Sequence, residues 1–160
     1  MALIVESGAG LADADSYISL ADARTFAANY GITLPADDAE AEIALRQGTQ
    51  YVDLQESCFI GERLTDTQAL AYPRDDDSGM PVELGRATAY AAAEFSLGTD
   101  VRASDDGKAI ASEEVVGAVK VEYFNNGKTG GTVTITKAMD ALKRLLVACK
   151  NNGFEFGVYR

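Results

Sequence analysis

Apolar residues spaced three and four positions apart recur along the chain and predict amphipathic helices. The first helix is predicted to begin after Ser19, which forms a capping box with Asp22, and to end at Gly31. A second helix is predicted to begin near Asp37, because a cluster of acidic residues there favours a helix N-terminus. Its apolar stripe comprises Ala41, Ala44, Leu45, Gly48 and Val52.

Two further helices follow the same spacing later in the chain. The third has Pro81 at its first helical position and ends before Gly98. Alanine on many of its faces would let neighbouring helices approach to the short end of ~8 to 10 Å. The fourth is predicted to begin with Thr136 as N-cap and to continue through Cys149.

At residues 119–123 apolar and polar residues alternate strictly, instead of recurring every three or four positions. This alternation predicts a half-buried strand. A glycine-rich loop follows, and residues 132–135 are predicted to return as a second strand. The predicted fold class is therefore mainly α, a helical bundle of about four helices with a small β-hairpin insertion near residues 115–135 and extended termini. We expect one helical domain at 1–152 and a C-terminal tail at 153–160.

Composition and charge exclude several function classes. The chain has 160 residues, no histidine and a formal net charge of −11. That charge would repel a phosphate backbone, and the sequence shows neither a basic patch nor a basic groove with interleaved aromatics. Without histidine the commonest general base and metal ligand are missing, and we predict no enzyme activity. No apolar run approaches a membrane span, so no membrane partner is expected.

The cysteines, Cys58 and Cys149, match no C-x-x-C metal or redox spacing. Cysteine is often simply a small core residue, so we expect two buried free thiols. A disulfide between them stays open as the alternative.

Three consecutive aspartates, Asp75, Asp76 and Asp77, precede the third helix. A calcium loop of the EF-hand type would place its glycine one position later than Gly79 and would need an acid at its twelfth position, which is missing. The favoured interpretation is an exposed acidic lip, solvated near a helix N-terminus. We predict no metal and no cofactor.

The C-terminal tail is unusually apolar and aromatic for a chain end. Its residues at 154, 156 and 158 alternate, so the tail could add as a strand to the sheet edge of a partner. Folding back onto its own core is the alternative. The predicted docking residues are Phe154, Phe156, Val158, Tyr159 and Arg160.

Five short motifs occur in an order that resembles a known family. They are A-L-I-V-E-x-G-x-G-L with A-D-S-Y-x-S-L-A-D-A (2–23), A-L-R-x-x-T-x-Y-V-D (44–53), Q-A-L-A-Y-P-R (68–74), M-P-V-E-L-x-x-A-T (80–88) and V-x-x-V-K-V-E-Y (116–123). This order resembles small tailed-bacteriophage proteins labelled DnaT-like single-stranded-DNA-binding proteins, which are similar in size and layout to head-tail connector, or adaptor, proteins. The chain departs from the family at Tyr72, where relatives commonly have tryptophan before the proline.

The resemblance implies a structural virion protein that assembles as a ring, typically a dodecamer, beneath the portal. On this interpretation the chain links the DNA-filled head to the tail, lines the DNA channel, and contacts the portal protein and a downstream tail or stopper protein. It would reside at the head-tail interface of the virion, and in the host cytoplasm during assembly. The tail would dock on the portal, while the acidic lip would let DNA pass without sticking. The alternative is a phage single-stranded-DNA-binding replication protein.

Overall fold

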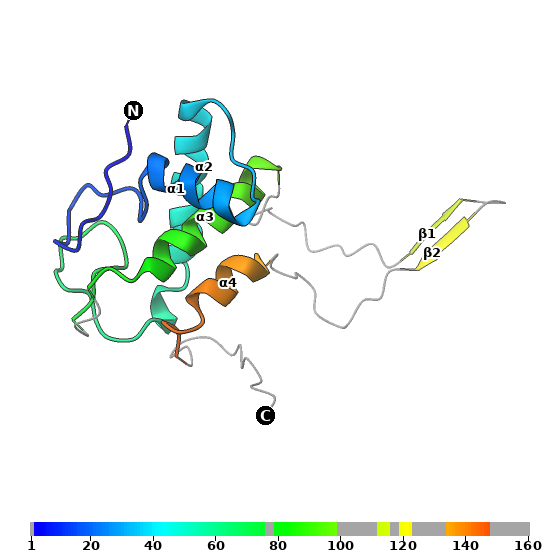
Figure 1. The fold of residues 1–160 in the computed structure, drawn as a ribbon. Helices are drawn as coiled ribbons and strands as arrows, with labels where there is room; N and C mark the ends of the chain where they lie inside the picture. Colours follow the sequence, from blue (N-terminus) through cyan, green and yellow to red (C-terminus); the bar gives the residue numbers. More distant parts are fainter. Residues whose placement is uncertain (1, 76–78, 99–111, 116–118, 123–133, 148–160) are drawn as a thin grey trace. The chain divides into compact units, whose positions relative to one another are not determined.

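The computed structural model describes residues 2–75, 79–98, 112–115, 119–122 and 134–147. The chain divides into two units, residues 100–134 and the remainder on either side of them. In the larger unit, α3 (Val82–Ser96) packs against the other three helices (Figure 1). The described part of the chain therefore confirms a mainly α fold with four α-helices.

Helix α1 (Leu20–Tyr30) has the limits that its capping residues predict. The backbone N–H of Asp22 donates to Ser19 Oγ at 3.1 Å, which satisfies an amide left unpaired by the first helical turn. Gly31 ends the helix with φ of +65°, in the left-handed region that glycine adopts without strain. Both predicted ends are confirmed.

The closest packing in the larger unit joins α3 and α2 (Asp38–Asp53). A Cβ added at Gly48 would lie 2.4 Å from the carbonyl oxygen of Thr88, so only glycine permits this approach. The contact confirms the close packing expected of the alanine-rich third helix. Pro81 is the N-cap of α3 rather than its first residue. A small core cluster lies nearby, formed by Ala23, Ala44, Leu45 and Ala92.

Helix α4 (Thr136–Leu142) is shorter than the sequence predicts. Beyond it, the N–H of Ile60 donates to Leu145 O at 3.2 Å and the N–H of Val147 donates to Cys58 O at 2.8 Å. These bonds belong to an antiparallel bridge with the segment after a short 3₁₀ turn, η1 (Glu56–Cys58). The prediction of a helix through residue 149 is wrong, because pairing with a distant segment replaces the last helical turns.

The second unit contains two short strands, β1 (Ser112–Val115) and β2 (Val119–Glu122). They pair antiparallel, with Val115 opposite Val119. The predicted strand at 119–123 is therefore present over residues 119–122. The predicted hairpin with 132–135 is not seen, and residues 132 and 133 lie outside the described residues. The partner of β2 precedes it in the chain, and the polar sequence of β1 carries little alternation that could have revealed it.

Two remaining expectations concern cysteine and the membrane. Cys58 is buried but disulfide-bonded, so the expectation of a free thiol there is wrong. Among the helices that the structure describes, none is long and apolar enough to cross a bilayer.

Candidate functional site

The N-terminal segment closes around a buried carboxylate. Glu6 is only 4% exposed, and its two oxygens accept four backbone N–H groups at 2.8 to 3.0 Å. The donors are Gly8, Ala9, Gly10 and Leu11. Convergent amides of this kind can bind a phosphate. Here the chain's own carboxylate fills the position, so the glycine-rich turn is structural.

A buried polar group supports the corner that contains the A-Y-P-R motif. The hydroxyl of Tyr17 donates to Asp53 and accepts the backbone N–H of Tyr72 at 3.1 Å. Asp53 also accepts the N–H of Ala71 at 3.2 Å. Burial raises the pKa of Asp53 to about 6, and burial beside that carboxylate raises the pKa of Tyr17 well above its usual range. This contact joins the N-terminal segment, α2 and the corner.

The corner is also fastened by a buried arginine. Arg74 is 7% exposed, and its guanidinium donates to the carbonyls of Ile60, Gly61 and Ala71 at 2.6 to 3.2 Å. It lies 5.8 Å from the ring centroid of Tyr72, a distance at which a cation and an aromatic face attract each other. All of these contacts are internal, so Arg74 is a structural residue.

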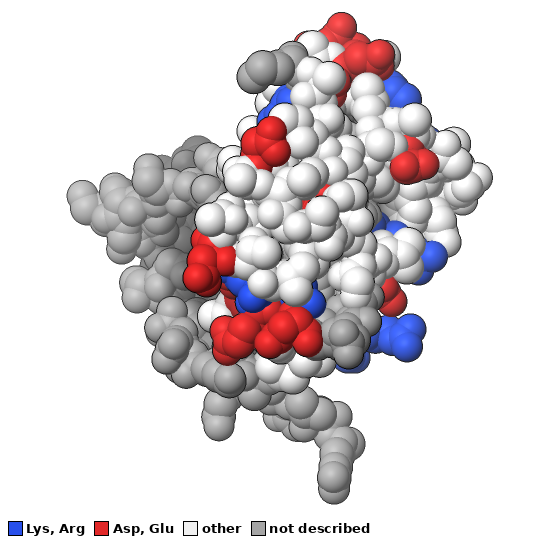
Figure 2. All heavy atoms as spheres, turned by 90° about the vertical axis from the view of Figure 1, so that its left-hand side faces the viewer, with Lys and Arg blue, Asp and Glu red and all other residues white. Residues whose placement is uncertain are grey.

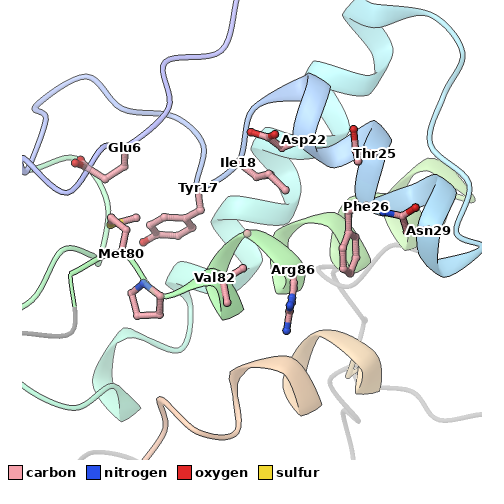
Figure 3. Close-up of a pocket in the computed structure, with 12 residues that line it drawn as sticks. Glu6, Tyr17, Ile18, Asp22, Thr25, Phe26, Asn29, Met80, Val82 and Arg86 are labelled. Carbon is pink, nitrogen blue, oxygen red and sulfur yellow. The ribbon is translucent and has the colours of Figure 1, made fainter.

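A pocket of about 430 Å³ lies between α1 and the start of α3 (Figure 3). In Figure 3 the ring of Phe26 extends from α1 towards α3, while Arg86 projects from α3 away from α1. Gly85 and Val82 line the α3 side, and Val82 is 59% exposed. The pocket combines an aromatic wall, an apolar floor and a positively charged side chain.

Aromatic rings continue from the pocket along α1 and α3. The Phe26 ring centroid lies 4.4 Å from that of Tyr30 and 5.2 Å from that of Tyr90 in an edge-to-face contact. Tyr30 is 56% exposed, and Arg86 one turn before Tyr90 is also exposed. Arg144 follows α4 and contacts Glu83 of α3 at 3.7 Å. We call the surface formed by Phe26, Tyr30, Arg86 and Tyr90 the Phe26 face.

Of the candidate site residues singled out by the sequence, the structure describes only Asp75. Asp75 is exposed, and it accepts the N–H of Glu62 at 2.8 Å through Oδ1, so its carboxylate helps to close the corner. Asp76, Asp77 and the tail 153–160 lie outside the described residues. The acidic lip, apart from Asp75, and the docking tail therefore stay predictions.

On the face that Figure 2 shows, the acidic side chains of the described residues do not form one continuous surface. On the face in Figure 2, acidic and basic side chains stand mostly around the margin, and uncharged residues fill most of the centre. Within the described residues, no group of three or more histidine, cysteine, aspartate or glutamate side chains is placed to hold a metal ion.

The whole chain, residues 1–160, matches one protein family, described as "Putative DnaT-like ssDNA binding protein". The chain belongs to this DnaT-like family. No curated protein and no solved structure matches it. The resemblance seen in the five motifs is thereby confirmed at the level of the family.

The family match overturns the head-tail connector interpretation. Its description names single-stranded DNA, which was our alternative, and nothing in the comparisons points to a virion, a portal or tail assembly. The motifs that suggested a connector contain residues that pack in the core, and these residues do not identify a partner. Leu45, Tyr51 and Val52 in one motif, and Ala71 and Tyr72 in another, are buried core residues. Such motifs specify a DnaT-like fold and carry no information about what it contacts.

Sequence reasoning missed the Phe26 face. Its aromatic residues come from helices separated by more than fifty positions, and Arg86 is the only basic residue of α3. The available signal was weak: Arg86 and Tyr90 lie one turn apart on a helix whose other faces carry mostly alanine.

Proposed function

We propose that this DnaT-like protein binds single-stranded DNA, and that the Phe26 face is where the strand lies. The observation that carries the proposal is the match of the whole chain to a family described as single-stranded-DNA-binding. The Phe26 face supplies a location, because it joins the exposed ring of Tyr30 to Phe26, which lines the same pocket as the exposed Arg86.

Stacking is the principal attraction on this surface. Bases of a single strand stack on aromatic side chains, and each such contact is worth about 1 to 3 kcal/mol. The ring of Tyr30 is the most accessible, while Phe26 and Tyr90 are partly buried and brace one another. Partly buried rings keep a fixed orientation, so little side-chain entropy is lost when a base stacks on the surface.

The net charge of −11 does not exclude such binding. At physiological ionic strength exposed charges are screened over about 8 Å, so the groups close to the strand decide its attraction. Arg86 lines the same pocket as the acidic Asp22, and Arg144 contacts Glu83 of α3. We therefore propose binding that depends mainly on stacking and only weakly on salt. Two phosphate contacts would give a slope of log K against log salt of about −1.4.

The experiment is a fluorescence-anisotropy titration of labelled oligothymidine with the wild-type protein and two variants. Tyr30→Ala removes an exposed ring from the Phe26 face and should weaken binding about fivefold or more. Ile43→Ala is the matched control, because Ile43 lies on α2 and is equally exposed, at 56%. Equal losses in the two variants, or no binding by the wild type, would remove the proposal.

Two expectations from the sequence accompany this proposal and stay predictions. One is that the protein is not an enzyme, and the other is that it forms a homo-oligomer. Size-exclusion chromatography with light scattering, with and without oligothymidine, measures the second directly.

A further inference from the structure

The pocket beside the Phe26 face is suited to a flat, partly apolar ligand. Phe26 forms one wall, and Ile18, Met80 and Val82 contribute apolar surface. Its volume of about 430 Å³ lies at the lower end of the ~300 to 1,000 Å³ that small-molecule sites occupy. A pocket of this size suits one nucleotide rather than a run of stacked bases.

The polar groups that line the pocket include several hydrogen-bond acceptors on α1, while the Arg86 guanidinium projects from α3 away from them. Asp22 Oδ2 accepts the hydroxyl of Ser19 at 2.6 Å, and Oδ1 has no partner among the residues that the structure describes. The hydroxyl of Thr25 donates to Ala21 O at 2.9 Å, so its oxygen lone pairs remain available to accept a hydrogen bond. Asn29 offers both a donor and an acceptor.

These acceptors discriminate between guanine, adenine and thymine. Guanine presents an N–H and an amino group side by side on its Watson–Crick edge, and one carboxylate can accept both. Adenine offers one amino group there. Thymine presents one N–H between two carbonyl oxygens, which a carboxylate repels.

We propose that this pocket takes one unstacked base of the bound strand and prefers guanine, with Asp22 accepting from its Watson–Crick edge and Phe26 contacting its ring. The inference rests on the single-stranded-DNA binding proposed above. It adds a sequence preference at one nucleotide to a surface that otherwise stacks any base.

The test compares three labelled oligonucleotides by fluorescence anisotropy at fixed salt. They are oligothymidine, the same strand with one central guanine, and the same strand with one central adenine. We expect guanine to bind about tenfold more tightly than thymine, because one or two hydrogen bonds to a charged acceptor are gained. The adenine strand separates hydrogen bonding from stacking, because both purines stack alike, and it should fall between the other two.

Two variants test whether the preference for guanine depends on Asp22. Asp22→Asn keeps the shape of the side chain but removes its charge, and should abolish most of the preference for guanine. Asp66→Asn removes the same charge from an exposed position outside the pocket, and should keep the preference intact. Circular dichroism verifies that both variants are folded.

Each contrary result has a distinct meaning. Equal binding of guanine and thymine strands by the wild type overturns the pocket inference and leaves single-stranded-DNA binding standing. Equal binding of guanine and adenine, or a preference that survives Asp22→Asn, shows that Asp22 does not read the base and also overturns it. Failure of all three strands to bind removes the proposed function and the inference together.

Discussion

Two arginines in this protein have opposite surroundings. Arg74 is buried near Phe59 and Tyr72, and backbone carbonyls take up its N–H groups. Arg86 is exposed, at a pocket that Phe26 also lines. The same residue types therefore build a rigid corner in one region and leave a contact surface in the other. Burial and hydrogen-bond satisfaction distinguish the two, and neither can be read from the residue types alone.

Replacing each arginine in turn tests most directly whether Arg74 is structural and Arg86 is not. Arg74→Ala leaves three carbonyl groups, of which that of Ala71 is buried, without their donor and should lower the free energy of unfolding by about 3 kcal/mol. Arg86→Ala should change it by less than about 0.5 kcal/mol, because its side chain is exposed. Urea denaturation followed by circular dichroism measures both. Similar losses in the two variants would contradict the division into corner and contact surface.

A second contrast concerns two glycines on neighbouring helical surfaces. Gly48→Ala would place a Cβ 2.4 Å from Thr88 O, and this overpacking should cost about 2 kcal/mol. Gly85 lines the pocket, and a Cβ there would meet Ile18 Cβ at 3.4 Å, which is an ordinary contact. Gly85→Ala should therefore leave stability unchanged or raise it through helix propensity. Thermal unfolding of the two variants would show the difference, and equal melting temperatures would contradict it.

The buried carboxylate under the corner gives a pH dependence. Burial raises the pKa of Asp53 from 3.8 to about 6, so the folded protein holds this proton more tightly than the unfolded chain does. The contribution of Asp53 to stability is complete below about pH 4 and is lost as pH rises through about 6. Wild type should lose stability relative to Asp53→Asn over that window in urea titrations. Parallel pH profiles would show that Asp53 is not responsible.

The smallest expected effect concerns salt. Arg86→Ala should reduce the slope of log K against log salt for oligothymidine by about 0.7, the contribution of one phosphate contact. Arg24→Ala is the control, because Arg24 already pairs with Asp38 at 2.5 Å. An unchanged slope in Arg86→Ala would place the phosphates elsewhere on the protein.

Local signals predicted the local features of this fold. Ser19, Asp22 and Gly31 fixed the two ends of α1 because caps act through bonds within one or two turns. The apolar stripe of the second helix, with Leu45 and Val52, is buried as expected, since its spacing of three and four residues follows from helix geometry.

Long-range contacts decided the features that the sequence could not predict. The fourth helix ends at Leu142 because residues 145–147 pair with 58–60, nearly ninety positions away. The strand β2 pairs with β1 before it, where the expected alternation is weak. The Phe26 face likewise requires α1 and α3 to meet, and a list of isolated arginines and tyrosines gives no sign of that meeting.

The most direct test of the proposed function is a nuclear magnetic resonance titration of the isotopically labelled protein with oligothymidine. Binding at the Phe26 face predicts that resonances of Phe26, Tyr30, Arg86 and Tyr90 shift progressively, while those of Phe59, Tyr72 and Arg74 stay fixed. Shifts confined to the corner or to other surfaces, or no shifts at all, would contradict the assignment of this face to single-stranded DNA.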